Sequence, residues 1–307
     1  MNIKNYLNSN KITLKDISRD CNIPYATLNN SLKNPDSMKV ANFKKIAAYL
    51  DISLDKLYSL FFQHNSPILN ALLEQKEANL SGNLYYYTQI HFAYNSNRIE
   101  GSKLTEEETR LLFETNTLID SQSTSVDDIF ETANHFHLFN VMLEEIDKPI
   151  SEELIKNYHR ILMNSTSSSH KDWFNVGEYK ALANEVGGSM TTKPADVSYE
   201  MKELLHWYST LEKILITDLI EFHFRFERIH PFQDGNGRIG RMILFRQCLK
   251  NNVVPFIITD DYKAYYYRGL SEFRTEPGYL MDTCLLMQDN YKVICTKYLN
   301  IPEDELV

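Results

Sequence analysis

The chain has 307 residues, of which 43% are hydrophobic and 12% aromatic, and its formal net charge is −9. This is enough apolar material for real hydrophobic cores and enough length for two domains, so the composition excludes a disordered tail. No uncharged apolar stretch reaches about 18 residues and no apolar leader follows Met1, so we expect a cytoplasmic protein without a membrane segment. The four cysteines lack metal-ligand spacing, which is typical of reduced cytosolic thiols.

The first 60 residues have the pattern of several short amphipathic helices. We expect helices at 11–18, 25–32, 37–50 and 53–60, with a turn at 21–24 that places Pro24 at the start of the second helix. This arrangement resembles a Cro/repressor-like helix-turn-helix domain, which we place at residues 1–62. The Gly that is usual in the turn is replaced by Cys21.

The charge of this N-terminal segment differs in sign from that of the rest. Nine Lys and Arg against five Asp give +4, and the remaining residues therefore carry −13. Such asymmetry favours contact with DNA, although +4 is modest, so a homodimer would be needed for useful affinity. The side chains expected nearest base edges or phosphates are Tyr25, Ala26, Thr27, Asn29, Asn30, Lys33 and Lys39. A dimerisation or substrate-docking module remains the alternative.

A second domain is expected at residues 63–307, and it begins with a polar joint at 63–67. Helical patterns continue at 68–80 and 85–99, and the second of these ends in the run Ser96-Asn97-Arg98-Ile99-Glu100-Gly101. Glu100 follows Ser96 by four residues, so both side chains project from one helical face. An ordinary helix with a Gly at its C-terminus has the same pattern.

The most informative segment is the run His230-Pro231-Phe232-Gln233-Asp234-Gly235-Asn236-Gly237-Arg238-Ile239-Gly240-Arg241. Gly235-Asn236-Gly237 allows backbone N–H groups to form an anion nest before a helix whose N-terminus is positive. Arg238 and Arg241 are one helical turn apart, so both can reach one polyphosphate. Asp234 supplies a hard oxygen for Mg²⁺, and His230 is the natural base for an incoming hydroxyl.

This run matches the HPFx(D/E)GNGRxxR motif of Fic-domain proteins at every defined position. The family is an all-α fold whose typical members transfer AMP from Mg·ATP to a Ser, Thr or Tyr hydroxyl of a target protein and release pyrophosphate. The resemblance implies that His230 is the base, Phe232 a buried anchor and Asp234 the Mg²⁺ ligand.

The same resemblance implies how the phosphates are held. Asn236 and the amides of Gly235 and Gly237 would hold the α- and β-phosphates, with Arg238 and Arg241 on the β- and γ-phosphates. Family members with degraded motifs transfer phosphate or other groups. This chain shows no such degradation, so AMP transfer is the default expectation.

Two further segments extend the resemblance over about residues 65 to 290. Residues 177–197, with Gly187-Gly188, look like the β-hairpin flap that pins the target beside the catalytic His, although an ordinary surface hairpin has the same pattern. The family places a Tyr against the nucleoside where this chain has Tyr265, Tyr266 and Tyr267, and we favour Tyr266 and Tyr267. The Asn that often follows is replaced by Phe273 or Arg274.

The run from Ser96 to Gly101 also fits the (S/T)xxxE(G/N) inhibitory motif of some Fic proteins. The resemblance implies that Glu100 pairs with Arg241 and keeps the γ-phosphate from its productive position. The chain thus resembles the self-inhibited class whose inhibitory helix, here around residues 85–101, precedes the Fic motif.

We therefore expect an all-α protein: a helix-turn-helix domain, then a helical Fic fold with a small β-hairpin flap. The expected activity is a nucleotidyltransferase that uses ATP and Mg²⁺ on a target protein, the chain itself included, with no membrane partner. Removal of AMP or transfer of phosphate at the same site remains an alternative. So does a DNA-binding transcriptional regulator whose Fic pocket senses ATP.

Overall fold

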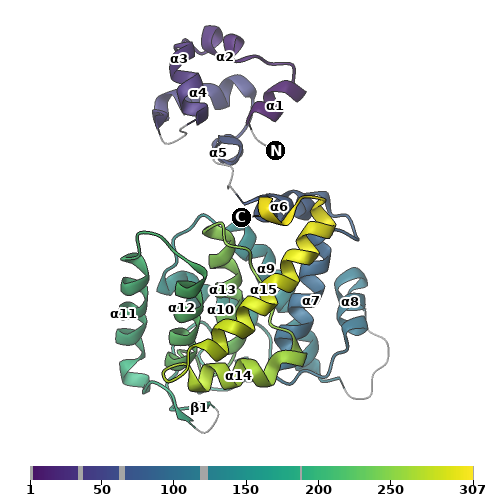
Figure 1. Ribbon diagram of the computed structural model, residues 1–307, viewed down its shortest axis with the longest axis vertical. Coiled ribbons are helices and arrows are strands. Elements are labelled where there is room, and N and C mark those ends of the chain that lie inside the picture. The colour runs from purple at the N-terminus through teal and green to yellow at the C-terminus, as the bar shows by residue number, and fades with distance from the viewer. Residues whose placement is uncertain (1–2, 34–36, 62–65, 118–123, 187–188, 307) are drawn as a thin grey trace. The chain divides into compact units, whose positions relative to one another are not determined.

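The computed structural model describes residues 3–33, 37–61, 66–117, 124–186 and 189–306, and it is dominated by helices (Figure 1). The chain divides into two compact units, Met1–Asn70 and Ala71–Val307. No helix in the described ranges is both long enough and apolar enough to cross a membrane. All four cysteines are free and buried.

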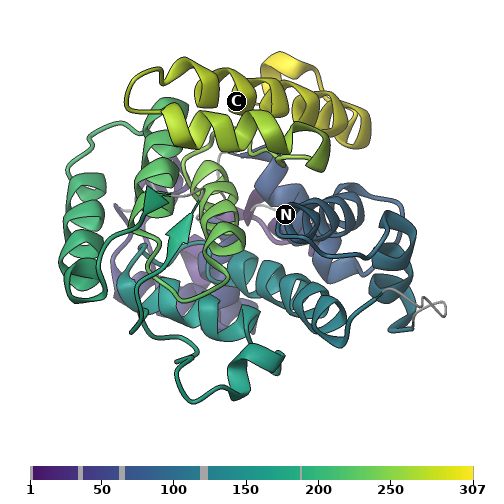
Figure 2. The ribbon, with the colours of Figure 1, turned by 90° about the horizontal axis from the view of Figure 1, so that it is seen from below.

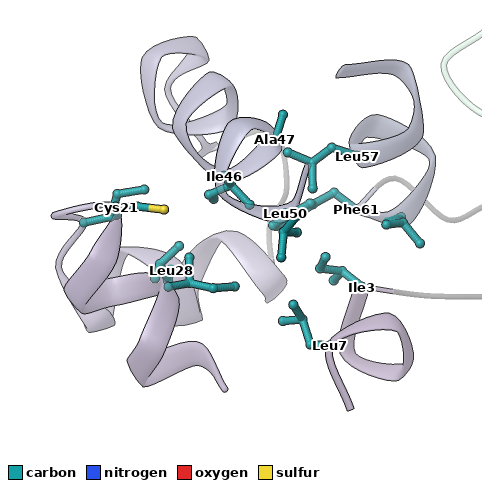
Figure 3. Close-up of a cluster of buried hydrophobic side chains, with 12 residues drawn as sticks. Ile3, Leu7, Cys21, Leu28, Ile46, Ala47, Leu50, Leu57 and Phe61 are labelled. Atoms are coloured by element: carbon teal, nitrogen blue, oxygen red, sulfur yellow. The ribbon is translucent and has the colours of Figure 1, made fainter. Parts of the chain in front are cut away.

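The first unit contains short helices that enclose one apolar core (Figure 3). Its helices are α1 (Ile3–Ser9), α2 (Leu14–Asp20), α3 (Tyr25–Lys33), α4 (Val40–Leu50) and α5 (Leu54–Phe61). The sequence pattern predicted four of them within a few residues and placed no helix before residue 11. Helix α1 brings Ile3 and Leu7 to the core, where both are buried. A single apolar pair in seven residues is too short a pattern to predict a helix on its own.

The turn between α2 and α3 explains why Cys21 is tolerated there. Helix α2 starts at a capping box in which Thr13 and Asp16 bond each other's backbone N–H groups. The helix ends at Cys21, which has ordinary right-handed backbone angles and a buried side chain. The left-handed residue is the next one, Asn22, with φ of 53°. Asn adopts that conformation more readily than most residues, so the turn needs no Gly at position 21.

The second unit is a helical body with one small hairpin. Its α-helices are α6 (Pro67–Ala78, which crosses the division between the units), α7 (Leu84–Ile99), α8 (Glu106–Thr115), α9 (Val126–Glu144), α10 (Glu152–Leu162), α11 (Val197–Ser209), α12 (Ile216–Ile229), α13 (Asn236–Lys250), α14 (Lys263–Glu272) and α15 (Gly278–Leu299). Short 3-10 turns are η2 (Ser167–His170), η3 (Pro194–Asp196), η4 (Asp260–Tyr262) and η5 (Glu303–Glu305).

Helix α13 is the centre of this unit. It contacts α7, α9, α10 and α12, and its side chains from Arg238 to Leu249 are buried. Arg246 is fully buried and donates to the carbonyl oxygens of Glu145, Ile146 and Lys148, which follow α9. The helix is therefore fixed on several sides, so the loop that leads into it starts from a rigid support.

The hairpin consists of β1 (Glu185–Val186) and β2 (Ser189–Met190), paired antiparallel with Glu185 opposite Met190 and Val186 opposite Ser189. The expected turn at Gly187-Gly188 lies outside the described residues. The hairpin and α14 lie at the same end of the second unit, as Figure 1 and the view from below in Figure 2 both show.

Candidate active site

One cavity of about 460 Å³ brings together four separate segments of the second unit. They are the end of α7, the hairpin, the α12–α13 junction, and α14. The lining residues are Glu100, Glu185, Val186, Met190, Thr191, Phe224, Glu227, Arg228, His230, Gly237, Arg241, Tyr266, Tyr267, Leu270 and Ser271. Predicted residues from distant parts of the sequence, before and after the motif run, thus meet in one cavity. This cavity is large enough for a nucleotide-sized ligand.

His230 ends α12 in a left-handed conformation, with φ of 52°, and its side chain is 16% exposed. Nδ1 lies 3.3 Å from the carbonyl oxygen of Glu227. Because a carbonyl oxygen only accepts, Nδ1 carries the hydrogen and Nε2 is left with a free lone pair. Burial lowers the pKa of His230 to about 4, although the bond to Glu227 opposes this, so the ring is neutral at pH 7.

The loop after His230 is held closed by Asn236. The Phe232 N–H donates to Asn236 Oδ1 at 2.7 Å, and Asn236 Nδ2 donates to Phe232 O at 2.8 Å. Phe232 itself is fully buried, as expected for an anchor. We expected Asn236 to hold phosphate; its Oδ1 and one hydrogen of its Nδ2 are used within the loop, and its backbone N–H stands at the start of α13.

The backbone N–H of Asn236 belongs to the N-terminal turn of α13. Gly235 caps the helix with φ of 77°, and the first helical hydrogen bond runs from the Ile239 N–H to Gly235 O at 3.0 Å. The N–H groups of Asn236, Gly237 and Arg238 therefore stand at the N-terminus without an acceptor within the helix. This is the geometry of an anion site at a helix N-terminus.

Asp234 lies on the same loop and is 52% exposed. Its Oδ1 accepts from the Gly235 N–H at 2.6 Å. His159 of α10 supports the loop from beneath, because its ring is stacked on Phe232 with centroids 3.9 Å apart and its Nε2 lies 3.1 Å from Asp234 O. Nδ1 of His159 accepts from the Gly177 N–H, so Nε2 is the donor. Sequence reasoning missed His159, since nothing local links α10 to the motif.

Arg241 is 3% exposed and is bonded to both predicted inhibitory residues. Nε donates to Ser96 Oγ at 3.1 Å, and Nη2 donates to Ser96 O at 2.9 Å and to Glu100 Oε1 at 2.7 Å. Glu100 is the C-cap of α7, one residue beyond the helix, with its side chain 31% exposed. Burial acts to raise the pKa of Glu100, but Arg241 and Arg238 outweigh it and hold that pKa below its usual value.

Arg238 is bound to a different carboxylate, on another helix. It is 3% exposed, and its Nη1 lies 2.5 Å from Glu131 Oε2 of α9, while Nη2 lies 3.6 Å from Asp234 Oδ1. Arg238 is not among the residues that line the cavity. The expectation that both arginines face one polyphosphate directly is therefore not met in this conformation, because each is bound to its own carboxylate. Glu131 was not predicted, since it lies more than a hundred residues before Arg238.

Glu227 is a further residue of the cavity that the sequence did not single out for chemistry. It is 10% exposed, and its Oε2 lies 3.9 Å from His230 Nδ1. Burial raises the pKa of Glu227 to about 8, with Arg241 opposing and Glu100 adding to the shift. Glu227 is therefore a neutral carboxylic acid at pH 7. Its position three residues before His230, near the C-terminal end of α12, is the local signal that could have found it.

The three adjacent tyrosines differ in their exposure to solvent. Tyr265 is 62% exposed and is not among the residues lining the cavity, whereas Tyr266 and Tyr267 line it. The Tyr266 hydroxyl lies 2.7 Å from His223 Nε2, so only its ring is free for a ligand. Tyr267 is 37% exposed, and its hydroxyl donates to Ile99 O at 3.4 Å.

In the first unit, the predicted DNA-facing residues are on the surface. Tyr25 is 47% exposed, and Ala26, Thr27, Asn29, Asn30 and Lys39 are also exposed. The side chain of Lys33 lies outside what the structure describes. Within the described ranges, no group of three or more His, Cys, Asp and Glu side chains is arranged to hold a metal ion.

Residues 149–248 match the family model described as Fic/DOC family, and this stretch contains the whole motif loop and both motif arginines. Protein adenylyltransferase Fic from Drosophila virilis is 25% identical over 241 residues, which is 76% of this chain and 47% of that protein. The protein of that name from Drosophila mojavensis is 26% identical over 249 residues, 79% of this chain and 45% of that protein. The chain thus spans about half the length of these curated relatives.

Two solved structures are similar in fold. A fragment of Fic-1 from C. elegans is 19% identical, with a TM-score of 0.58, over 94% of this chain and 88% of that chain. A Fic domain containing signaling protein from Bacteroides thetaiotaomicron is 22% identical, with a TM-score of 0.56, over 78% of this chain and 94% of that chain. Residues 149–248 thus resemble the Fic/DOC family, and these curated relatives carry the name protein adenylyltransferase.

Proposed function

We propose that the second unit is a protein adenylyltransferase that moves AMP from ATP to a Ser, Thr or Tyr hydroxyl of a target protein. The observation that carries this proposal is the state of His230. It is neutral, its Nδ1 is bound to Glu227 O, and it shares one cavity with Gly237 and Arg241 of the α13 N-terminus. The names of the curated relatives support the same reaction.

The proposed reaction uses these positions. Nε2 of His230 takes the proton of the target hydroxyl, whose oxygen attacks the α-phosphorus of ATP. The bond from the α-phosphorus to its bridging oxygen breaks, and pyrophosphate leaves with the electron pair. The amides at the start of α13 hold the phosphate charge, together with Arg241 once it is released from Glu100. The hairpin holds an extended segment of the target beside His230 by strand addition.

Asp234 is the residue that would hold Mg²⁺. Its carboxylate is half-exposed and uses Oδ1 for the Gly235 N–H, which leaves Oδ2 for a cation. A single carboxylate beside substrate phosphates fits the way Mg²⁺ is usually bound. When bound, the ion would neutralise part of the phosphate charge.

We further propose that the chain inhibits itself through Glu100. While Glu100 is bound to Arg241, this arginine is not free to bind the γ-phosphate, and the carboxylate repels phosphate from the first turn of α13. The inhibitory contact is local to the second unit, because Ser96, Glu100 and Arg241 all belong to it.

Mass spectrometry tests the activity. Wild type, Glu100→Gly and His230→Ala are incubated with Mg·ATP and a host lysate, and added mass on proteins is measured. We expect added AMP with Glu100→Gly, little with wild type and none with His230→Ala. Added phosphate, or loss of AMP from a pre-modified target, would instead assign one of the alternative reactions.

For the first unit we propose a second function, sequence-specific DNA binding. The domains would be residues 1–62, helix-turn-helix, and residues 63–307, Fic. The exposed polar side chains Tyr25, Thr27, Asn29 and Asn30 at the start of α3 support this role, because base edges are read by such donors and acceptors. Selection of bound DNA from a random pool tests it, and a pool that enriches no sequence favours a docking or dimerisation module.

A further inference from the structure

Lys180 is a buried cation beside the candidate active site. It lies in the segment between α10 and β1 and is only 4% exposed. Its Nζ donates to Asn184 Oδ1 at 2.7 Å, to Thr191 Oγ1 at 2.6 Å and to Ile229 O at 3.3 Å. An ammonium group has three hydrogens, and all three are used.

These contacts join the hairpin to the two residues that flank His230. Asn184 precedes β1 and Thr191 follows β2, so Nζ binds both ends of the hairpin. On the other side, Nζ binds Ile229 O, and the Lys180 N–H donates to Pro231 O at 2.8 Å. Lys180 therefore brackets the catalytic loop immediately before and after His230.

Two further hydrogen bonds join the stem of the hairpin to the loop after His230. Asn184 Nδ2 donates to Phe232 O at 3.1 Å, and the Leu182 N–H donates to Gln233 Oε1 at 3.2 Å. The stem of the hairpin thus runs along residues 229–233. Lys180 is the one charged side chain in this set of contacts. Its Nζ alone contacts both the hairpin and the loop that carries His230.

The buried positive charge of Lys180 needs a physical explanation. Among the described residues, no carboxylate forms an ion pair with Lys180, and burial lowers the pKa of Lys180 to about 8. A neutral side chain would avoid the cost of burying an ammonium. What the ammonium supplies is three donors that diverge from one point, and a positive charge that disfavours protonation of His230.

We propose that Lys180 is a positioning residue that holds the hairpin at a set place relative to His230, so that a bound target presents its hydroxyl to Nε2. This inference rests on the proposed function for its catalytic consequence. Its structural part, the link between the hairpin and the loop, can be tested independently of any activity.

The first test measures the hairpin in the full chain by amide hydrogen exchange. Lys180→Met keeps the aliphatic stem and removes the three donors, and Lys202→Met, an exposed lysine of α11, is the matched control. We expect exchange in peptides covering residues 181–192 to accelerate at least ~10-fold in Lys180→Met, because charged hydrogen bonds are lost. Exchange in α13 and in the control stays as in wild type.

Unchanged exchange in the hairpin of Lys180→Met overturns the proposal. A variant that fails to fold is replaced by Thr191→Val, which removes one acceptor of Nζ and leaves the ammonium in place. For Thr191→Val we expect a smaller acceleration confined to the same peptides. Acceleration spread over the whole second unit would show general destabilisation and would also overturn the proposal.

The second test measures catalysis in the Glu100→Gly chain. Adding Lys180→Met should lower AMP transfer to protein at least ~10-fold, the effect of a displaced reacting group, while the Kd for Mg·ATP stays the same. A parallel loss of ATP affinity, or unchanged transfer despite a loosened hairpin, contradicts the positioning role. If Glu100→Gly with native Lys180 transfers no AMP, the proposed function fails, and hydrogen exchange alone decides the role of Lys180.

Discussion

The carboxylate of Glu100 occupies the space beside Gly237 that a side chain at that position would fill. A Cβ atom built on Gly237 overlaps Glu100 Oε1 and comes within 3.0 Å of Arg241 Nη1. The same Oε1 accepts from Arg241 Nη2 at 2.7 Å. Glu100 therefore sits against the first turn of α13. Under the proposed function, its carboxylate and the nucleotide phosphates compete for Arg241.

Removing this carboxylate should activate the enzyme. We expect Glu100→Gly to raise AMP transfer roughly 10- to 100-fold, the size of a typical coupling between two sites, because Arg241 is released to the nucleotide. Adding Arg241→Ala should cancel the gain. The measurement is AMP incorporation at equal ATP in wild type, the single variant and the double variant, with Glu203→Ala, an exposed carboxylate of α11, as control. Equal rates in wild type and Glu100→Gly would exclude self-inhibition by Glu100.

His230→Ala should abolish transfer without weakening nucleotide binding. Loss of a general base typically costs at least ~10²-fold in rate, while the amides of α13 and both arginines remain. The base works only when neutral, and burial lowers the pKa of His230 to about 4. The rate should therefore hold from neutral pH down to pH 5 and fall as the pH drops through about 4. Transfer by His230→Ala near the Glu100→Gly rate, measured in that background, would remove His230 from the mechanism.

Asp234→Asn should raise the Mg²⁺ concentration needed for turnover. The amide keeps one oxygen that can accept the Gly235 N–H, so the loop should survive while the charged cation ligand is lost. Titration of activity with Mg²⁺ in the Glu100→Gly background measures the effect, and circular dichroism checks the fold. Full activity at low Mg²⁺ would show that Asp234 does not hold the ion.

The second unit should lose stability between pH 7 and pH 5. Burial lowers the pKa of His135, His159 and His223 to about 3 each, whereas the value in an unfolded chain is about 6.5. Below pH 6.5 the unfolded chain binds protons that the folded chain does not, so unfolding is favoured by up to about 1.4 kcal/mol per pH unit for each histidine.

Urea unfolding followed by tryptophan fluorescence measures this loss, because Trp173 and Trp207 both lie in the second unit. The unfolding midpoint should fall between pH 7 and pH 5, and His223→Asn should fall less steeply than wild type. An unchanged midpoint over this range would contradict the lowered pKa of these histidines, because the raised pKa of Glu227 acts in the opposite direction but offsets only one of the three.

The pair Asn29→Ala and Asn30→Ala should remove DNA sequence preference while keeping salt-sensitive binding. Base contacts specify a sequence, whereas phosphate contacts by lysines only position the protein. Gel shifts with selected and scrambled DNA at two salt concentrations measure both effects. Asn8→Ala, an exposed Asn on α1, is the control. Retained preference in the double variant would move the reading surface away from α3.

The helical composition was predictable from the sequence. Where apolar spacing gave helix ranges, from residue 11 to residue 99, the structure has helices within a few residues of those ranges. The left-handed turn at Gly235 and the proximity of His230 to the α13 N-terminus followed from neighbours within twelve positions. The pairing of Glu100 with Arg241 was expected from family resemblance, and the two side chains are in contact.

Tertiary structure alone decided the partners that lie far apart in the chain. Glu131 binds Arg238, Lys180 binds Ile229 O, and His159 stacks on Phe232. It also decided that the Asn236 side chain closes the loop and that Tyr266 turns its hydroxyl towards His223. Periodicity along one helix records which face is buried, because that depends on the spacing of apolar residues within the helix. Which charged group meets which across two helices depends on how those helices pack, and no local spacing records it.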